Sequence, residues 1–300
     1  MTGEYHVPVM VPQVMELYAR VSANPRKVLD CTLGAGGHAL EMLKSGGVEK
    51  YIGIDADPEA RRRAEARLAA YSQVLELRPG FFDEVLQGLG GSFDFILFDL
   101  GLSMHQFEDS ARGFSFLREE ALDMRMSPEQ ETSAFDIVNS TREEDLANLI
   151  YAYGEERYSR HIAKAICKAR ARGQVRTSAA LAQIIADAVP PSYRHGRIHP
   201  ATRTFQAIRI SVNDELGREE RGLALAADLL APGGILAVIS FHSLEDRIAK
   251  RFCKDLAKSK GLSELYKKPL VPDEAECEAN PASRSAKLRA VQRPSAGEKA

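Results

Sequence analysis

Several features are scarce or missing in this sequence, and each absence excludes a class of protein. No run of apolar residues reaches the roughly 18 needed to cross a membrane. The N-terminus, MTGEYHVPVMV, lacks the basic start and apolar centre of a secretory signal peptide. Cysteine is rare: Cys31, Cys167, Cys253 and Cys277 lie far apart and form no Cys-x-x-Cys pair, so they suggest neither a zinc site nor a disulfide framework. We therefore expect a soluble, cytoplasmic protein with reduced cysteines and no membrane partner.

Net charge is almost absent too. The chain has 40 Lys and Arg against 42 Asp and Glu, a formal charge of −2, which by itself makes no case for nucleic acid. The local distribution is uneven, because 157–176 holds seven Lys or Arg and no acid, and 188–213 holds four arginines and no acid. One basic helix is usually a solvated face. Two acid-free segments in one part of the chain favour a polyanion partner.

Spacing places four of these bases on one face of a helix. They lie three or four residues apart: Arg157, Arg160, Lys164 and Lys168. The second segment contributes Arg194, Arg197, Arg203, Arg209, His195 and His199. Tyr158, Tyr193 and Phe205 lie among these charges, and they are expected either to stack on bases or to belong to the core.

The stretch that organises the chain is 27–57, KVLDCTLGAGGHALEMLKSGGVEKYIGIDAD. Its periodicity predicts a strand ending at Asp30, a glycine loop, a helix and a second strand ending at Asp55. Glycines in such a loop let backbone approach a ligand at the start of a helix. An acid at the tip of the next strand can accept hydrogen bonds from both hydroxyls of a ribose. The stretch is therefore half of a nucleotide-binding unit.

Two cofactors fit this unit. Gly34-x-Gly36-x-x-Ala39, with Asp55 about 20 residues further on, also matches the dinucleotide fingerprint, so the loop alone leaves NAD and S-adenosylmethionine equally open. Asp30 favours the second, because its carboxylate would repel a pyrophosphate but suits the ammonium of a methionine moiety. A tight turn without a ligand is the remaining interpretation.

Strands and helices alternate in only part of the chain. Buried strands are expected to end near 30, 55, 78 and 99, and a fifth, at 235–241, follows a turn at 231–234. The tail is expected to add a strand pair near 266–271 and 287–292. No convincing strand is found between 104 and 213, where helices are expected at 134–138, 142–153, 156–171 and 179–188.

The fold class is therefore α/β, a doubly wound and mostly parallel sheet with an inserted helical domain. We expect 1–103 and 214–300 to form the two parts of the sheet domain. The insertion, 104–213, is expected to bind RNA.

Several longer peptides carry a resemblance to a known family. They are LGAGGH, DLGLS, RGFSF, LDMRM, YGEERYSRHIAKAI, HPATRTFQAIRI and APGGILAVISFHSLEDRIAKRF. Together they resemble the RsmH family, also called MraW, bacterial methyltransferases that use S-adenosylmethionine to methylate the exocyclic N4 of a cytidine in small-subunit (16S) ribosomal RNA, in the decoding centre. The resemblance covers nearly the whole chain. It implies the class I S-adenosylmethionine-dependent methyltransferase fold, and small-subunit ribosomal RNA as partner, within an assembled subunit.

The resemblance also implies site residues. The residues expected to bind the cofactor are Gly36, Gly37, His38, Asp55, Phe81, Asp99 and Gln106. The peptide PGFF at 79–82 leaves open whether Phe81 or Phe82 faces the adenine.

Cytosine N4 is a poor nucleophile, so a transferase must orient it and stabilise the positive charge that develops on it. Asp99, at the tip of the fourth strand, is the expected acceptor, with Ser103 in the same DLGLS peptide. No aromatic follows Asp99, so His242 and Ser243 are the candidates for holding the base. The alternatives are that Asp99 only orders the cofactor and that His242 caps a helix. Neither a metal nor a covalent intermediate is required. The alternatives are an NAD-dependent dehydrogenase and a non-catalytic RNA-binding ribosome-assembly factor.

Overall fold

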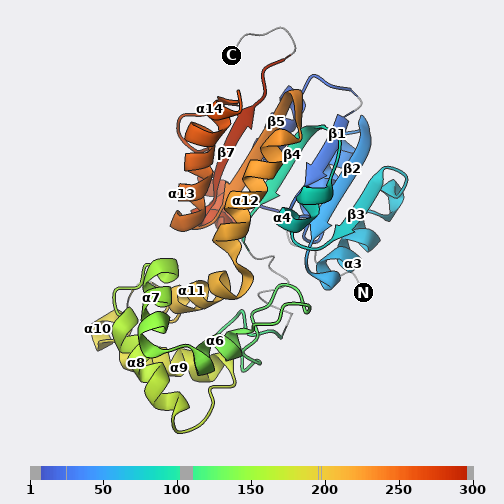
Figure 1. Ribbon diagram of the computed structural model, residues 1–300. Coiled ribbons are helices and arrows are strands. Elements are labelled where there is room, and N and C mark those ends of the chain that lie inside the picture. The colour runs from blue at the N-terminus through green and yellow to red at the C-terminus, as the bar shows by residue number, and fades with distance from the viewer. Residues whose placement is uncertain (1–7, 25, 102–110, 195, 197, 296–300) are drawn as a thin grey trace. The chain divides into compact units, whose positions relative to one another are not determined.

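The computed structural model describes residues 8–24, 26–101, 111–194, 196 and 198–295. They divide into two compact units: residues 1–101 with 216–300, called the sheet unit, and residues 102–215, called the helical unit. The chain therefore leaves the sheet unit once and returns to it (Figure 1). None of the described helices combines the length and the apolar character needed to span a bilayer.

The sheet unit contains a seven-stranded sheet of order β3-β2-β1-β4-β5-β7-β6. The parallel strands are β1 (Arg26–Asp30), β2 (Val48–Asp55), β3 (Leu75–Pro79), β4 (Phe93–Asp99) and β5 (Leu230–Ser240). The antiparallel strands at the other edge are β7 (Lys287–Gln292) and β6 (Ser263–Glu264). The expected doubly wound, mostly parallel sheet is thus confirmed.

Helices cover both faces of this sheet, because alternate residues of a strand point to opposite sides. On β4, Phe95 and Leu97 pack with α1 (Val11–Arg20) and α2 (Gly37–Lys44). Ile96 and Phe98 face the other way, toward α12 (Glu215–Asp228) and α13 (Ser243–Arg251). Shorter helical segments complete the layers: α3 (Pro58–Arg67), η1 (Ala69–Tyr71), α4 (Phe82–Val85), η2 (Leu86–Gly88), η3 (Phe252–Leu256), α14 (Ala257–Ser259), α15 (Glu274–Ala279) and η4 (Pro281–Ser285).

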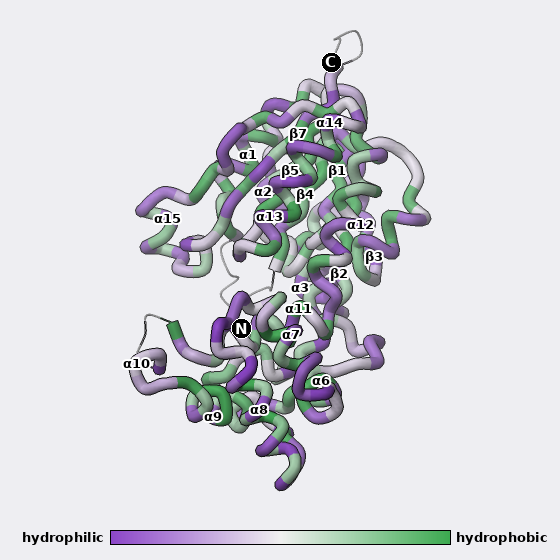
Figure 2. The backbone as a smooth tube through the Cα atoms, turned by 60° about the vertical axis from the view of Figure 1, so that its left-hand side comes forward, coloured by the Kyte–Doolittle hydropathy of each residue, from purple (hydrophilic) through white to green (hydrophobic). Residues whose placement is uncertain are grey.

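The helical unit has its own core. Its helices are α6 (Ala134–Ser140), α7 (Glu143–Gly154), α8 (Ser159–Arg170), α9 (Ser178–Ala188), α10 (Pro191–Arg194) and α11 (Thr202–Asn213). Hydrophobic and hydrophilic stretches alternate along them (Figure 2), as expected for helices with one buried face. Among its described residues the unit contains no strand, only an isolated bridge between Ala121 and Thr177.

Three expectations in this architecture were wrong or incomplete. Helix α11 was not expected, because its N-cap, Ala201, gives no side-chain cap signal. The expected turn at 231–234 is an irregularity inside β5, where Gly233 has a φ of 78° and the register with β4 shifts. In the expected strand at 266–271 only Leu270 pairs, as an isolated bridge to Leu288, and the short partner of β7 is β6 instead.

Candidate active site

The glycine loop joins β1 to α2, and its geometry explains the residue types. Gly36 is the N-cap of α2 with a φ of 74°, a left-handed conformation that favours glycine. A Cβ on Gly36 would lie 2.9 Å from Leu68, and one on Gly37 would lie 2.9 Å from the ring of Pro8. The loop therefore packs closely against its neighbours on the protein side. The backbone polar groups of the loop face the tips of the flanking strands instead.

Asp30 closes β1 and is 1% exposed. The hydroxyl of Tyr51 donates to its Oδ2 at 2.9 Å, and the backbone N–H of Thr32 donates to its Oδ1 at 3.1 Å. Burial raises the pKa of Asp30 to about 6, against the lowering effect of the Tyr51 hydrogen bond. Each oxygen retains a lone pair, so a cationic ligand group would meet a carboxylate whose position is already fixed.

Asp55, at the tip of β2, is held by the glycine loop itself. The backbone N–H of Gly34 donates to Oδ2 and that of Asp57 donates to Oδ1, each at 2.8 Å. Burial also raises the pKa of Asp55 to about 6, and the two N–H donors oppose this rise. With one lone pair left on each oxygen, the carboxylate can accept two neighbouring hydroxyls, as a ribose presents them.

Asp99, at the tip of β4, has a different environment. Its backbone N–H donates to Thr32 Oγ1 at 2.6 Å, which ties β4 to the loop after β1. Its Oδ2 lies 3.4 Å from Nε2 of His38, in the first turn of α2. Asp99 Oδ1 and both nitrogens of His38 are shielded from solvent and make no hydrogen bond to any residue that the structure describes.

Buried polar atoms without a partner are costly, so they mark a place where a polar ligand fits. The orphaned atoms lie between the glycine loop and the tip of β4. Asp55, whose remaining lone pairs suit hydroxyl groups, lies on the other side of the loop. The donor set therefore fits a nucleoside-containing cofactor that also carries a polar or charged group.

The structure distinguishes Phe81 from Phe82. The Phe82 ring packs edge-on against Phe98, with centroids 5.3 Å apart, and a Cβ on Gly222 would lie 2.5 Å from it. Phe82 is thus part of the core beneath α12. Phe81 remains the candidate for an adenine contact.

Helix α12 fixes the position of Phe81, and this contact was not indicated by the sequence. The guanidinium of Arg218 lies 3.6 Å from the centroid of the Phe81 ring, a cation–π arrangement. Arg218 also donates to Asp83 at 2.5 Å and to Glu84 at 2.7 Å, and Arg221 donates to the second oxygen of Asp83. No sequence pattern links 218 to 81, because the contact depends on how α12 crosses the sheet.

His242, expected to hold the base, has a local role in the structure. It is the N-cap of α13, and its Nδ1 accepts from the backbone N–H of Glu245 at 3.3 Å. Glu245 completes a capping box by accepting from the backbone N–H groups of Phe241 and His242. The sequence SFHSLE already contained this signal. Ser103 and Gln106, also expected at the site, lie outside the described residues.

Several basic residues of the helical unit are used inside it. Arg170 donates to the carbonyls of Val138 and Thr141, at 2.7 and 2.6 Å, and so ends α6. Arg209 makes a bidentate pair with Glu215. Phe205 is buried, which places it in the core rather than among base-stacking residues.

The four basic residues that the sequence placed on one helix face are exposed. Arg160, Lys164 and Lys168 are exposed on α8, although Arg160 also donates to the Glu144 carbonyl at 3.4 Å. Arg157 lies over the rings of Tyr158 and Tyr193, 4.9 and 5.2 Å from their centroids. The exposed cations remain for an external partner, whereas the two tyrosines pack against the core of the helical unit and the Tyr193 hydroxyl donates to Glu156.

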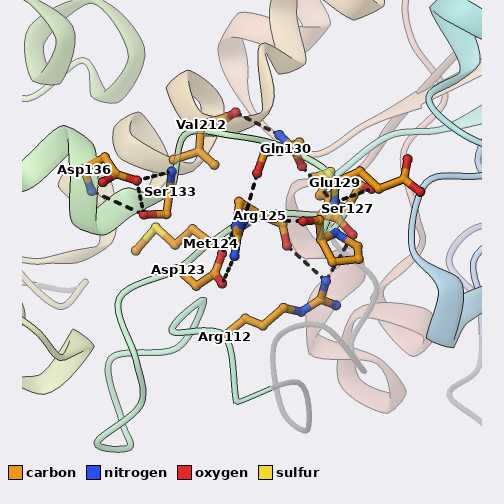
Figure 3. A network of polar contacts seen from close by, with 12 residues as sticks. Arg112, Asp123, Met124, Arg125, Ser127, Glu129, Gln130, Ser133, Asp136 and Val212 are labelled. Atoms are coloured by element: carbon orange, nitrogen blue, oxygen red, sulfur yellow. Dashed lines mark hydrogen bonds and ion pairs between the residues drawn. The ribbon is translucent and has the colours of Figure 1, made fainter.

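The LDMRM peptide is structural. Arg125 donates to both oxygens of Asp123 and to the Gln130 carbonyl, and Arg112 donates to the carbonyls of Arg125 and Met126 (Figure 3). Asn213, at the end of α11, accepts from the Met126 N–H. These bonds fix an irregular segment that has no strand or helix of its own.

Known proteins are similar in sequence to this chain over most of its length. A family model described as the MraW methylase family matches residues 3–294. The Ribosomal RNA small subunit methyltransferase H of Persephonella marina is 44% identical over 293 residues, covering 96% of this chain and 99% of the relative. The protein of the same name from Synechococcus elongatus is 49% identical over 265 residues, covering 88% and 87%. Among solved structures, an rRNA methylase from Streptococcus thermophilus has a TM-score of 0.44 at 10% identity and covers 97% of this chain and 99% of its own.

The family model includes the glycine loop, the tips of the first five strands and the helical unit. The resemblance in the short peptides is thereby confirmed over almost the whole sequence. The chain belongs to the MraW methylase family.

Proposed function

We propose that this protein transfers a methyl group from S-adenosylmethionine to the exocyclic N4 of a cytidine in small-subunit ribosomal RNA, near the decoding centre. The observation that carries the proposal is that Asp99 Oδ1 and the His38 nitrogens, at the tip of β4 in a methylase-family chain, have no hydrogen-bond partner among the described residues. No observation favours the NAD-dependent dehydrogenase.

The cofactor would be held by residues from three strand tips. Asp55 accepts the ribose hydroxyls, Gly36 and Gly37 line the loop, Phe81 contacts the adenine, and Asp30 compensates the ammonium charge. Gln106 is assigned to the same pocket by the family resemblance alone. Bound there, S-adenosylmethionine would supply a methyl group on a positively charged sulfur, and that sulfur is a good leaving group.

The chain's own contribution to the chemistry centres on Asp99. Its Oδ1, which has no partner among the described residues, would accept a hydrogen bond from the amino group of cytosine, which turns the nitrogen lone pair toward the methyl. The carboxylate would then stabilise the positive charge that grows on nitrogen as the new bond forms and the bond between sulfur and methyl breaks, and the N4 proton would pass to Asp99 or to solvent. His38, 3.4 Å from Oδ2, limits the movement of this carboxylate. His242 and Ser243 are the residues we assign to the base, with the capping role of His242 as its competing explanation, and Ser103 is a further catalytic candidate from the DLGLS peptide.

The helical unit would bind the RNA backbone. Lys164 and Lys168 project from α8 into solvent, and Arg157 and Arg160 extend the same basic surface. Such contacts fix position without reading sequence. We propose the assembled small subunit as the substrate, since the decoding centre is formed there.

Mass spectrometry of ribosomal RNA tests the activity directly. Small subunits from cells lacking this protein are incubated with purified protein and S-adenosylmethionine, and the modified nucleosides are quantified. We expect one N4-methylcytidine per subunit, formed only with the cofactor. A protein that binds subunits without adding the methyl group would instead be the non-catalytic assembly factor.

A further inference from the structure

The helix that follows β5 carries a second concentration of positive charge, in the sheet unit. It runs through α13, the π-helical turn η3 and α14, from Ser243 to Ser259. One face is buried in the core of the sheet unit, through Leu244, Ile248, Phe252, Cys253 and Ala257. The opposite face exposes Arg247, Lys250, Arg251, Lys254 and Lys258. These cations therefore project from a helix whose position is fixed by packing.

Three of the cations form what we call the lysine row: Lys250, Lys254 and Lys258. They are spaced four residues apart, so each lies next to a like charge, an arrangement that destabilises a helix by a few tenths of a kcal/mol per pair, of order 0.2–0.5. Lys254 lies within the π-helical turn Phe252–Leu256. Turns of this kind are rare in proteins, and those that occur often lie at functional sites. The stability of the helix therefore does not explain the presence of three neighbouring lysines.

Other helices of the sheet unit neutralise their bases. Arg20 pairs with Glu16, Lys44 with Glu41, and both Arg62 and Arg63 with Glu59. In the described part of the chain, no carboxylate lies within ion-pair distance of the lysine row.

Three of the acids near the row are already engaged, whereas Asp255 is exposed beside it and forms no ion pair with it among the described residues. Asp246 is bound by Lys287 and Arg289, both at 2.9 Å, and Glu245 is buried in the capping box. Glu220 pairs with Arg251 at 3.2 Å. The row therefore keeps its full charge for an external anion.

We propose that the lysine row is a contact surface for the RNA backbone, on the sheet unit and separate from the basic face of α8. The inference rests on the proposed RNA substrate and adds a surface to it. Eight residues of helix span about 12 Å. One strand of a duplex presents a phosphate about every 3.4 Å of its axis, so three or four phosphates lie within that length. Lysine suits this contact because its ammonium is a flexible point charge that needs no fixed geometry.

The test compares three matched triple variants. The first replaces Lys250, Lys254 and Lys258 by Gln, and the second replaces them by Arg. The control replaces Lys44, Lys50 and Arg62 by Gln; these are half-exposed or exposed bases of the same unit that already have acidic partners. First and control variants change the net charge equally. Affinity for protein-free small-subunit ribosomal RNA is measured at several salt concentrations, and cofactor affinity by calorimetry.

The Gln row variant should bind RNA more weakly, and the slope of log affinity against log salt should flatten by about 2 to 3, at about 0.7 per contact for single strands and 0.9 for a duplex. The Arg row variant should restore the slope, and the control should match the native protein. Cofactor affinity should be equal in all four proteins.

Three results would overturn the proposal. A control that weakens binding as much as the Gln row would reduce the effect to net charge. A Gln row variant with native affinity and slope would leave the row without this partner. Weaker binding to assembled subunits but not to protein-free RNA would assign the row to a ribosomal protein. Failure of the proposed function itself differs, because then the native protein would bind RNA but transfer no methyl group.

Discussion

Asp55 and Asp99 occupy equivalent places, at the tips of the two strands that flank β1, yet they are treated in opposite ways. Asp55 has a backbone N–H on each oxygen. Asp99 has no hydrogen bond on Oδ1 among the described residues and only a 3.4 Å approach of His38 to Oδ2. A group that binds the same ligand atoms throughout a reaction can be fully oriented in advance. A group that acts on the substrate must keep an oxygen free.

The comparison predicts its largest effect for Asp99→Ala. We expect single-turnover methyl transfer at saturating cofactor to fall by about 10²–10³-fold, the usual loss for one charge-stabilising group. Affinity for S-adenosylmethionine should change little. Asp94→Ala, at the other end of the same strand, is the control and should keep the native rate. A near-native rate in Asp99→Ala would restrict Asp99 to the binding pocket.

The reverse pattern is expected for Asp55→Ala. Loss of two hydrogen bonds to a charged group, at about 1.5 kcal/mol or more each, should weaken cofactor binding by about 100-fold or more in a calorimetric titration. The rate at saturating cofactor should recover to within a few-fold of native, about 1 kcal/mol or less. Asp57→Ala is the matched control, because Asp57 caps α3 through the Glu59 N–H and is expected to affect stability alone. Equal loss of rate in both strand-tip variants would remove the distinction between them.

Acidification should reproduce part of the Asp55 effect in the native protein. The pKa of Asp55 and that of Asp30 are both raised to about 6, so each carboxyl takes up a proton as the pH falls through 6. A ligand that needs the ionised form must displace that proton, so affinity should fall about tenfold per group between pH 7 and pH 5. Cofactor titrations over this range, in Asp55→Asn beside the native protein, should show a shallower decline in the variant.

A third carboxyl sharpens the comparison with the smallest effect on function. Glu219 on α12 is 1% exposed, and neither oxygen has a hydrogen-bond partner among the described residues. Burial, and then the nearby Glu245, raise its pKa to about 10. Because the folded pKa lies above the unfolded value of 4.5, the native protein loses stability as the pH rises from about 4.5 toward 10, by up to about 1.4 kcal/mol per unit.

Glu219→Gln removes that titration. Its thermal midpoint should exceed the native one increasingly from pH 5 to pH 8, while methyl transfer stays native. A constant difference across this range would contradict the raised pKa. In that case the unpaired oxygens of Glu219 would not differ in kind from the unpaired oxygen of Asp99.

The sequence predicted the strand tips well, and physical reasons explain what it missed. Asp30, Asp55 and Asp99 end buried apolar runs, so their places follow from periodicity alone. The choice between Phe81 and Phe82 depends on the path of α12, which meets the chain again more than 130 residues later. Helix α11 escaped notice because arginines interrupt its apolar face and no capping residue marks its start.

For His242 the sequence supports two interpretations, a contact with the base and the N-cap of the next helix. A histidine and a serine just past a strand tip are candidates for contacts with a substrate. The capping box with Glu245 gives His242 a complete local explanation. The cap is what the structure shows for His242, and its contact with the base stays a prediction.

The pairing of β4 with β5 has a consequence during synthesis on the ribosome. Phe95 pairs with Ile235, and everything between them must be translated before this edge of the sheet can close. At about 5–20 residues per second, the β4 edge stays open for roughly 7–28 s. The helical unit lies wholly within that interval, so it can fold while the edge waits. The nascent chain thus exposes an apolar strand edge for seconds, a period in which a chaperone can bind it.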